Sequence, residues 1–91
     1  MGNAARIQEK PDSVRRASAD GLRTQILARW PDSRLMVWTA SLDPGWSCHV
    51  EGPPELIREV LRAYGPTPSR DLTLITPGSI VYRWLQPGGP A

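Results

Sequence analysis

The sequence is poor in the residues from which disulfides, metal sites and catalytic centres are built. It has 91 residues but only one cysteine and one histidine. Cys48 has no partner for an intramolecular disulfide, and one thiol with one imidazole cannot form a four-ligand zinc site. Glycine-rich nucleotide-binding motifs and the phosphate-loop motif are absent, and the acidic residues show no metal-ligand spacing. The sequence therefore predicts no catalytic residues, no metal site and no cofactor.

Cys48 and His49 are the only adjacent nucleophile and base, and they are poorly placed for catalysis. Both fall in a predicted strand, where neighbouring side chains point to opposite faces. We therefore expect Cys48 to pack in the core and His49 to lie on a polar surface. A domain of this size buries only about 60 to 65% of its unfolded surface, which leaves little core for a deep cleft. Neither enzyme activity nor a small-molecule substrate is expected.

Long hydrophobic runs are also missing. The first residues, Met1 to Arg6, have no apolar core of the kind that export signals need, and no apolar run approaches the length of a membrane span. A single free cysteine suits a reducing compartment. We therefore expect a cytoplasmic location and no membrane partner.

The charge surplus is small and lies near the amino terminus. The formal net charge is +2, and Lys10 is the only lysine beside ten arginines. Residues 1–23 carry five basic and three acidic side chains, whereas residues 24–91 carry six of each. A dedicated nucleic-acid binder usually concentrates cations on its folded body, so the charge does not by itself predict one. A GC-rich genome would explain the arginine bias equally well.

The first of two predicted amphipathic helices ends before Pro31, which cannot continue a helix. Asp12 or Ser13 can cap its start. A later start at Ser18 is the alternative, since Gly21 weakens a helix by roughly 1 kcal/mol relative to alanine. The apolar stripe of this helix comprises Leu22, Ile26, Leu27 and Trp30.

The second helix is predicted between Pro54 and Gly65. Proline suits the first turn of a helix, and Glu55 complements the positive end of the helix dipole. Gly65-Pro66 is a residue pair that helix ends favour. The apolar stripe comprises Leu56, Ile57, Val60, Leu61 and Tyr64.

Four predicted strands form two hairpins. Each hairpin has a proline and a glycine between its strands, as turns favour. The strands are rich in β-branched and aromatic residues. They span residues 34–41 and 46–51 around Asp43-Pro44-Gly45, and residues 71–76 and 79–85 around Pro77-Gly78.

This element order predicts an α+β fold with the order αββαββ. A helix and a hairpin cannot bury their apolar sides alone, so the two units should merge into a two-layer sandwich. We expect a four-stranded, mainly antiparallel sheet with both helices on one face. The order is a circular permutation of the ferredoxin-like order βαββαβ, with the second and fourth strands central.

The domain is predicted to span residues 12–85, between a flexible arm at 1–11 and a flexible tail at 86–91. Which face of the last strand is buried remains open, because apolar residues occupy both of its faces. The predicted core comprises Leu22, Ile26, Leu27, Trp30, Leu35, Val37, Cys48, Val50, Leu56, Val60, Leu61, Leu72 and Leu74, with either Ile80 and Tyr82 or Val81 and Leu85.

One layer of helices leaves the other face of the sheet uncovered, and the first and last strands make that face partly apolar. Tryptophan, tyrosine and methionine are enriched at interface cores. The predicted partner-binding residues are Met36, Trp38, Tyr82 and Trp84. The alternative is that the arm or the tail covers this face, or that the tryptophans simply fill the core.

The sequence thus favours a small intracellular protein-interaction module, a regulator, adaptor or inhibitor that forms a homodimer or binds a protein partner. The alternative is a nucleic-acid-binding protein in which bases stack on aromatic residues of the sheet. Its phosphate contacts would come from Arg15, Arg16, Arg23, Arg34, Arg70 and Arg83.

Overall fold

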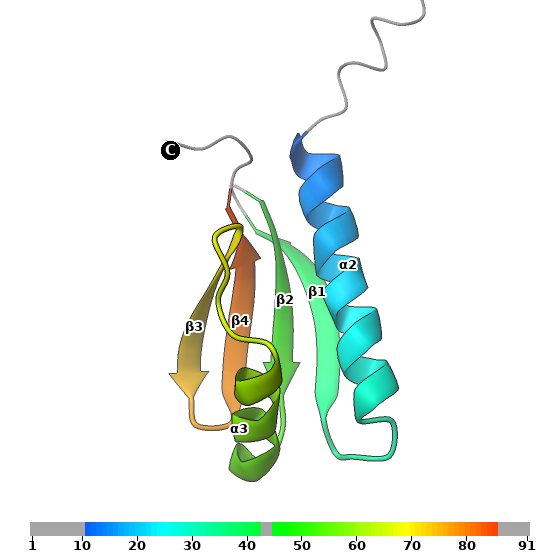
Figure 1. The fold of residues 1–91 in the computed structure, drawn as a ribbon, viewed down its shortest axis with the longest axis vertical. Coiled ribbons are helices and arrows are strands. Elements are labelled where there is room, and N and C mark those ends of the chain that lie inside the picture. Colours follow the sequence, from blue (N-terminus) through cyan, green and yellow to red (C-terminus); the bar gives the residue numbers. More distant parts are fainter. Residues whose placement is uncertain (1–10, 43–44, 86–91) are drawn as a thin grey trace, which may run out of the picture.

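Two helices and a four-stranded antiparallel sheet make up the computed structural model, which describes residues 11–42 and 45–85 (Figure 1). The predicted class and the order αββαββ are confirmed. Most of the predicted arm, the tail and the first two residues of the Asp43-Pro44-Gly45 turn lie outside the described residues. The helices are α2 (Pro11–Arg29) and α3 (Pro54–Ala63), and the strands are β1 (Met36–Leu42), β2 (Gly45–Glu51), β3 (Arg70–Thr76) and β4 (Ser79–Trp84).

The strand order across the sheet is β1-β2-β4-β3, with antiparallel neighbours throughout. The second and fourth strands are therefore central, as the permuted order predicts. Helix α3 leads from β2 to β3, and β4 is inserted between these two strands, which is the split βαβ arrangement. Strands β1 and β3 form the two edges of the described sheet.

Helix α2 is continuous across Gly21, so the later predicted start at Ser18 is wrong, and the helix begins at Pro11, just before the predicted caps Asp12 and Ser13. A Cβ atom at Gly21 would meet nothing within 4 Å, so no neighbouring group packs closely enough to require glycine at this position. Ala19, Leu22 and Ile26 are buried at helical spacing. The hydroxyl of Ser33 donates to the carbonyl of Trp30 just beyond the helix end.

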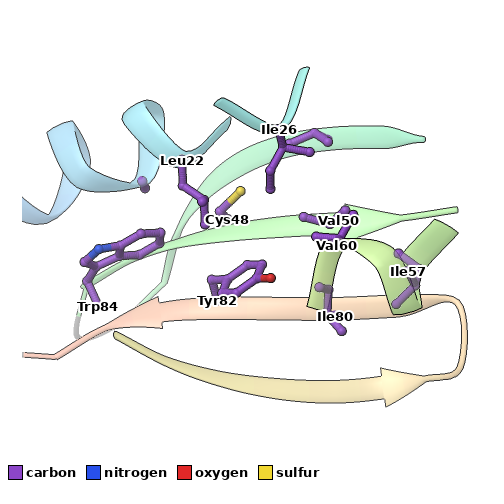
Figure 2. Packing of buried hydrophobic residues seen from close by; sticks show 11 residues of the cluster. Leu22, Ile26, Cys48, Val50, Ile57, Val60, Ile80, Tyr82 and Trp84 are labelled. Carbon is purple, nitrogen blue, oxygen red and sulfur yellow. The ribbon is translucent and has the colours of Figure 1, made fainter. Parts of the chain in front are cut away.

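Both helices pack on the same face of the sheet. Leu22 and Ile26 of α2 and Ile57 and Val60 of α3 belong to one buried cluster with the sheet (Figure 2). The neighbouring ends of the helices also touch, because the indole Nε1 of Trp30 donates to the Glu59 carboxylate at 3.1 Å. The sheet residues of this cluster are Val37, Cys48, Val50, Ile80, Tyr82 and Trp84.

Two predicted core residues belong neither to the buried cluster nor to the half-buried residues packed against it. Leu74 is 52% exposed and Leu56 is half-buried. Leu74 stands opposite Ile80 in register, but it belongs to edge strand β3, in which no residue is buried. The prediction for Leu74 was wrong because helix α3 packs on β4 and leaves the edge strand uncovered.

The turn between β3 and β4 touches the segment that connects β2 to α3. The amide of Gly52 donates to the carbonyl of Gly78 at 2.9 Å. A Cβ atom at Gly78 would lie 2.6 Å from the carbonyl oxygen of Gly52, so only glycine fits this approach. In the described residues, neither helix combines the length and the apolar character that a membrane crossing needs.

Candidate interaction surface

The pairing register shows which side chains share the helix-free side of the sheet. Side chains alternate along each strand, and the registers align them into rows across the four strands. We call this side the uncovered face, since both helices lie on the other side (Figure 1). Its residues are Met36, Trp38, Ala40, Ser47, His49, Glu51, Asp71, Thr73, Ser79, Val81 and Arg83.

An aromatic pair on the uncovered face joins edge strand β1 to central strand β2. Trp38 stands opposite His49 in register, and their rings stack with centroids 5.2 Å apart and planes 29° apart. Both side chains are half-buried. Val81 follows in the same row and is buried, whereas Met36, at the end of β1, is 58% exposed. The solvent-facing apolar groups of this face are therefore Met36 and part of Trp38.

His49 carries a polar atom without a visible partner. Its ring nitrogen Nε2 is buried and makes no hydrogen bond within the described part of the chain. A buried polar group without a partner costs roughly 1 to 3 kcal/mol. His49 is half-buried on the side of the sheet that the helices leave open, so its exposed atoms, unlike the buried Nε2, can be contacted from outside the domain.

Charged side chains of both signs surround the aromatic pair. Glu51 and Asp71 are exposed acids on this face, and Arg83 is an exposed base. Asp71 and Arg83 are direct cross-strand neighbours on β3 and β4. An apolar centre with a polar rim is the arrangement that protein–protein interfaces show.

The prediction that Tyr82 and Trp84 lie on the uncovered face was wrong. They alternate in phase with Ile80, so they point toward the helices, where Tyr82 is fully buried and Trp84 is 8% exposed (Figure 2). The hydroxyl of Tyr82 donates to the carbonyl of Tyr64 beyond α3. Of the four predicted partner-binding residues, the structure brings only Met36 and Trp38 together on this face.

The six arginines nominated for nucleic acid do not converge. Of these six, only Arg83 is a strand residue whose side chain belongs to the uncovered face. Arg70 lies on the helix side, where its guanidinium covers the Tyr82 ring at 5.3 Å and donates to the carbonyl of Gly65. Arg15 is buried on α2. The remaining three, Arg16, Arg23 and Arg34, are exposed on α2 or before β1.

Cys48 and His49 diverge as the alternation of strand side chains requires. Cys48 is fully buried on the helix side, while His49 is on the uncovered face. Burial raises the pKa of the Cys48 thiol from 9.0 to about 12, although the charges of Arg23 and Arg70 partly oppose this shift. A thiol that stays protonated and buried is a packing group and a poor nucleophile.

Strand β3 contributes a second exposed apolar feature. Leu74 and Ile75 are 52% and 56% exposed, and a register shift follows Leu74. Sequence reasoning placed Leu74 in the core and so missed this edge. The available signal was the strand order itself, because central second and fourth strands leave the third strand at an edge.

A shallow cleft of about 340 Å³ lies where the two helices end. Arg29 and Arg62 line it together with Glu59, whose carboxylate already accepts the indole of Trp30. Arg29 stacks over the Trp30 ring at 5.1 Å. These groups hold the helix ends together, and their charges have both signs, so the cleft favours no ligand of one charge.

Among the described residues, no three side chains of His, Cys, Asp or Glu are grouped to hold a metal ion. The sequence matches no protein-family model, and comparison with curated proteins and with solved structures gives no significant match.

Proposed function

We propose that this chain is a small protein-interaction module, and that the uncovered face docks a protein partner. The observation that carries the proposal is the position of Met36 and Trp38 on the side of the sheet opposite both helices. Methionine and tryptophan gain much from desolvation, and they are enriched at the centres of interfaces.

The surroundings of Trp38 define the surface that the partner offers. An apolar group would cover Met36 and the outer side of the Trp38–His49 stack. Charged groups of both signs would face Glu51 and Arg83 at the rim.

The charge of the uncovered face supports a protein partner over nucleic acid. Its strands carry two acids, Glu51 and Asp71, and one arginine, Arg83. Nucleic-acid affinity depends on cations that displace counterions from phosphates, so a face with more carboxylates than guanidinium groups opposes it. Tyr82 and Trp84 are buried under the helices, which leaves Trp38 as the one tryptophan or tyrosine that the described strands offer for base stacking on this face.

Affinity capture with the full chain tests the proposal. The baits are the unchanged chain, Met36→Asp and Val14→Asp, each added to a lysate of the host cell. Met36 and Val14 are both exposed apolar residues, but Val14 lies on α2. A charge in place of an exposed apolar contact residue should weaken binding of the captured protein at least tenfold, as measured by calorimetry with that protein purified.

Val14→Asp is the matched control for added charge, and circular dichroism establishes that each variant is folded. Capture of one protein by the unchanged chain and Val14→Asp, with loss in Met36→Asp, supports the proposal. Equal capture by all three baits contradicts it. Titration with single-stranded RNA and duplex DNA at two salt concentrations tests the alternative, since phosphate-dependent binding weakens steeply as salt rises.

A further inference from the structure

Strand β3 has an open edge with self-complementary features. Among the described strands its only neighbour is β4. Arg70 and Asp71 stand at its start, but the next five residues, 72–76, carry no charge and no proline. Charged residues and prolines are the usual means by which edge strands avoid pairing with other chains.

The hydrogen bonds of Arg70 reveal which backbone groups point out from this edge. Its amide donates to the carbonyl of Thr67 at 3.1 Å, and its carbonyl accepts from the amide of Thr67 at 2.9 Å. The neighbouring residue Ser69 instead accepts from Leu85, next to β4. Backbone groups alternate in direction along an antiparallel strand. The amides and carbonyls of Leu72 and Leu74 therefore point away from β4, toward the open edge.

These outward groups select one symmetric register. In an antiparallel pair centred on Thr73, Leu72 of each copy stands opposite Leu74 of the other, and all four outward groups of each copy are used. A pair centred on Leu72 would place Leu74 opposite Arg70, whose groups Thr67 already occupies. The register shift after Leu74 disfavours a centre further along the strand.

Side chains favour the same register. Leu72 and Leu74 lie on the helix side of the sheet, so pairing about Thr73 brings two leucine pairs into contact across the interface. Leu74 is 52% exposed in the single chain, and contact with the second copy would lower this exposed fraction. The two Thr73 side chains would face each other on the opposite side of the sheet, a favourable cross-strand pair.

We infer that β3 pairs with β3 of a second copy of this chain, antiparallel about Thr73, so that the two sheets become one. The self-complementary pattern of Leu72, Thr73 and Leu74 is the reason for choosing a second copy over a different extended peptide. Because Thr67 limits the pairing to a short segment, the interface is small and the dimer is weak. This dimer does not depend on the proposed function, since Met36 and Trp38 lie elsewhere on the sheet.

Disulfide trapping tests the register in the full chain. In the inferred dimer the Thr73 residues of the two copies stand opposite each other and form a non-hydrogen-bonded pair. Their Cα atoms are about 4.5 Å apart, a separation that a disulfide can bridge. Thr73→Cys should therefore form a covalent dimer in oxidised glutathione at least tenfold faster than control cysteines. The native Cys48 is buried and will not compete.

Asp71→Cys and Ile75→Cys are the matched controls. Both positions are exposed and lie two residues from Thr73 on the same strand. In the inferred register each of these residues is four positions, or about 13 Å, from its equivalent in the second copy, which is too far for a disulfide. A second change, Leu74→Lys, in the Thr73→Cys chain should return the rate to that of the controls, because the charge would stand opposite a leucine.

Light scattering of the unchanged chain up to millimolar concentration gives the second measurement. We expect the average molar mass to rise with concentration from that of a monomer toward that of a dimer. Fast trapping at Thr73 that Leu74→Lys abolishes supports the inference. Trapping at Thr73 no faster than at the controls overturns it, whether the chain is monomeric, pairs with a different peptide or associates through another surface. A dimer that survives Leu74→Lys but not Met36→Asp would instead assign self-association to the uncovered face.

Discussion

The rings of Trp38 and His49 stack on each other. The Nε2 atom of His49, however, has no hydrogen-bond partner within the described chain. The stack removes apolar area from water, while the buried Nε2 atom loses its hydration. In the isolated domain these two effects oppose each other. The histidine therefore contributes less to stability than an apolar ring of similar size would.

Replacement of His49 by phenylalanine separates the two effects. His49→Phe keeps a ring against Trp38 and removes the unsatisfied nitrogen, so we expect the free energy of unfolding to stay unchanged or to rise by up to about 1 kcal/mol. Urea denaturation measures this change. His49→Ala, which removes the ring as well, should lower stability. A large loss in His49→Phe would mean that the imidazole has a hydrogen bond that the described residues do not provide.

Arginine side chains serve as flat covers for aromatic rings in this domain. The guanidinium groups of Arg16 and Arg70 lie 5.1 Å and 5.3 Å from the ring centres of Trp46 and Tyr82, respectively. A planar guanidinium stacks on a ring and still donates hydrogen bonds, which an ammonium group does less well. Sequence reasoning assigned these arginines to phosphates because charge is visible in a sequence, whereas stacking depends on tertiary contacts.

At the level of helices and turns, two glycines have opposite structural roles. Gly21 lies inside α2 with open space around it, whereas Gly78 lies against the Gly52 carbonyl. Gly21→Ala should stabilise the domain by up to about 1 kcal/mol, because alanine favours the helix and restricts the unfolded chain. Gly78→Ala should destabilise it, since the added methyl would collide with backbone. Thermal unfolding of both variants measures the difference, and a loss of stability in Gly21→Ala would contradict this account.

Local sequence signals were sufficient to predict each helix and strand. Proline and glycine mark the ends of α3 and the turn before β4, and strand formers fill the segments between them. Exposure of Leu74 does not follow from such local signals, because it depends on the position of β3 at the edge of the sheet. Its burial also depends on how far helix α3 reaches across the sheet, and the residues of β3 alone do not indicate that distance.

Alkaline stability is a property of the whole molecule that follows from two buried groups. Burial raises the pKa of Cys48 from 9.0 to about 12 and raises the pKa of Tyr82 above its usual 10.0. Above pH 9.0 the unfolded chain therefore loses protons that the folded chain retains. The contribution of these groups is fully present below their unfolded pKa values and is lost as pH rises, by about 1.4 kcal/mol per pH unit for each group.

We therefore expect the free energy of unfolding to fall from about pH 9 upward. Urea denaturation at a series of pH values measures the slope. Cys48→Ala should remove the part of the slope that begins near pH 9 and keep the part that begins near pH 10, which belongs to Tyr82. A stability that does not change with pH across this range in the unchanged chain would contradict the account.

The architecture was predictable as a whole, but the composition of the uncovered face was only partly so. Two helices and two hairpins that cannot stand alone have few ways to combine, and one of these gives the observed strand order. On β4, however, both alternating sets of side chains are apolar. The alternation could not decide whether Tyr82 or Val81 faces the helices, because that choice depends on the registers with β2 and β3.

The last strand along the described sheet is also one of its two central strands. β4 pairs with both β2 and β3 and supplies Ile80, Tyr82 and Trp84 to the core. During synthesis on the ribosome, the earlier segments would emerge with a gap where β4 belongs. The sheet can close only after this strand is released, so folding must follow translation of β4 and depends on contacts between distant parts of the chain. Until then, the unpaired sides of β2 and β3 are open to chaperones or to aggregation.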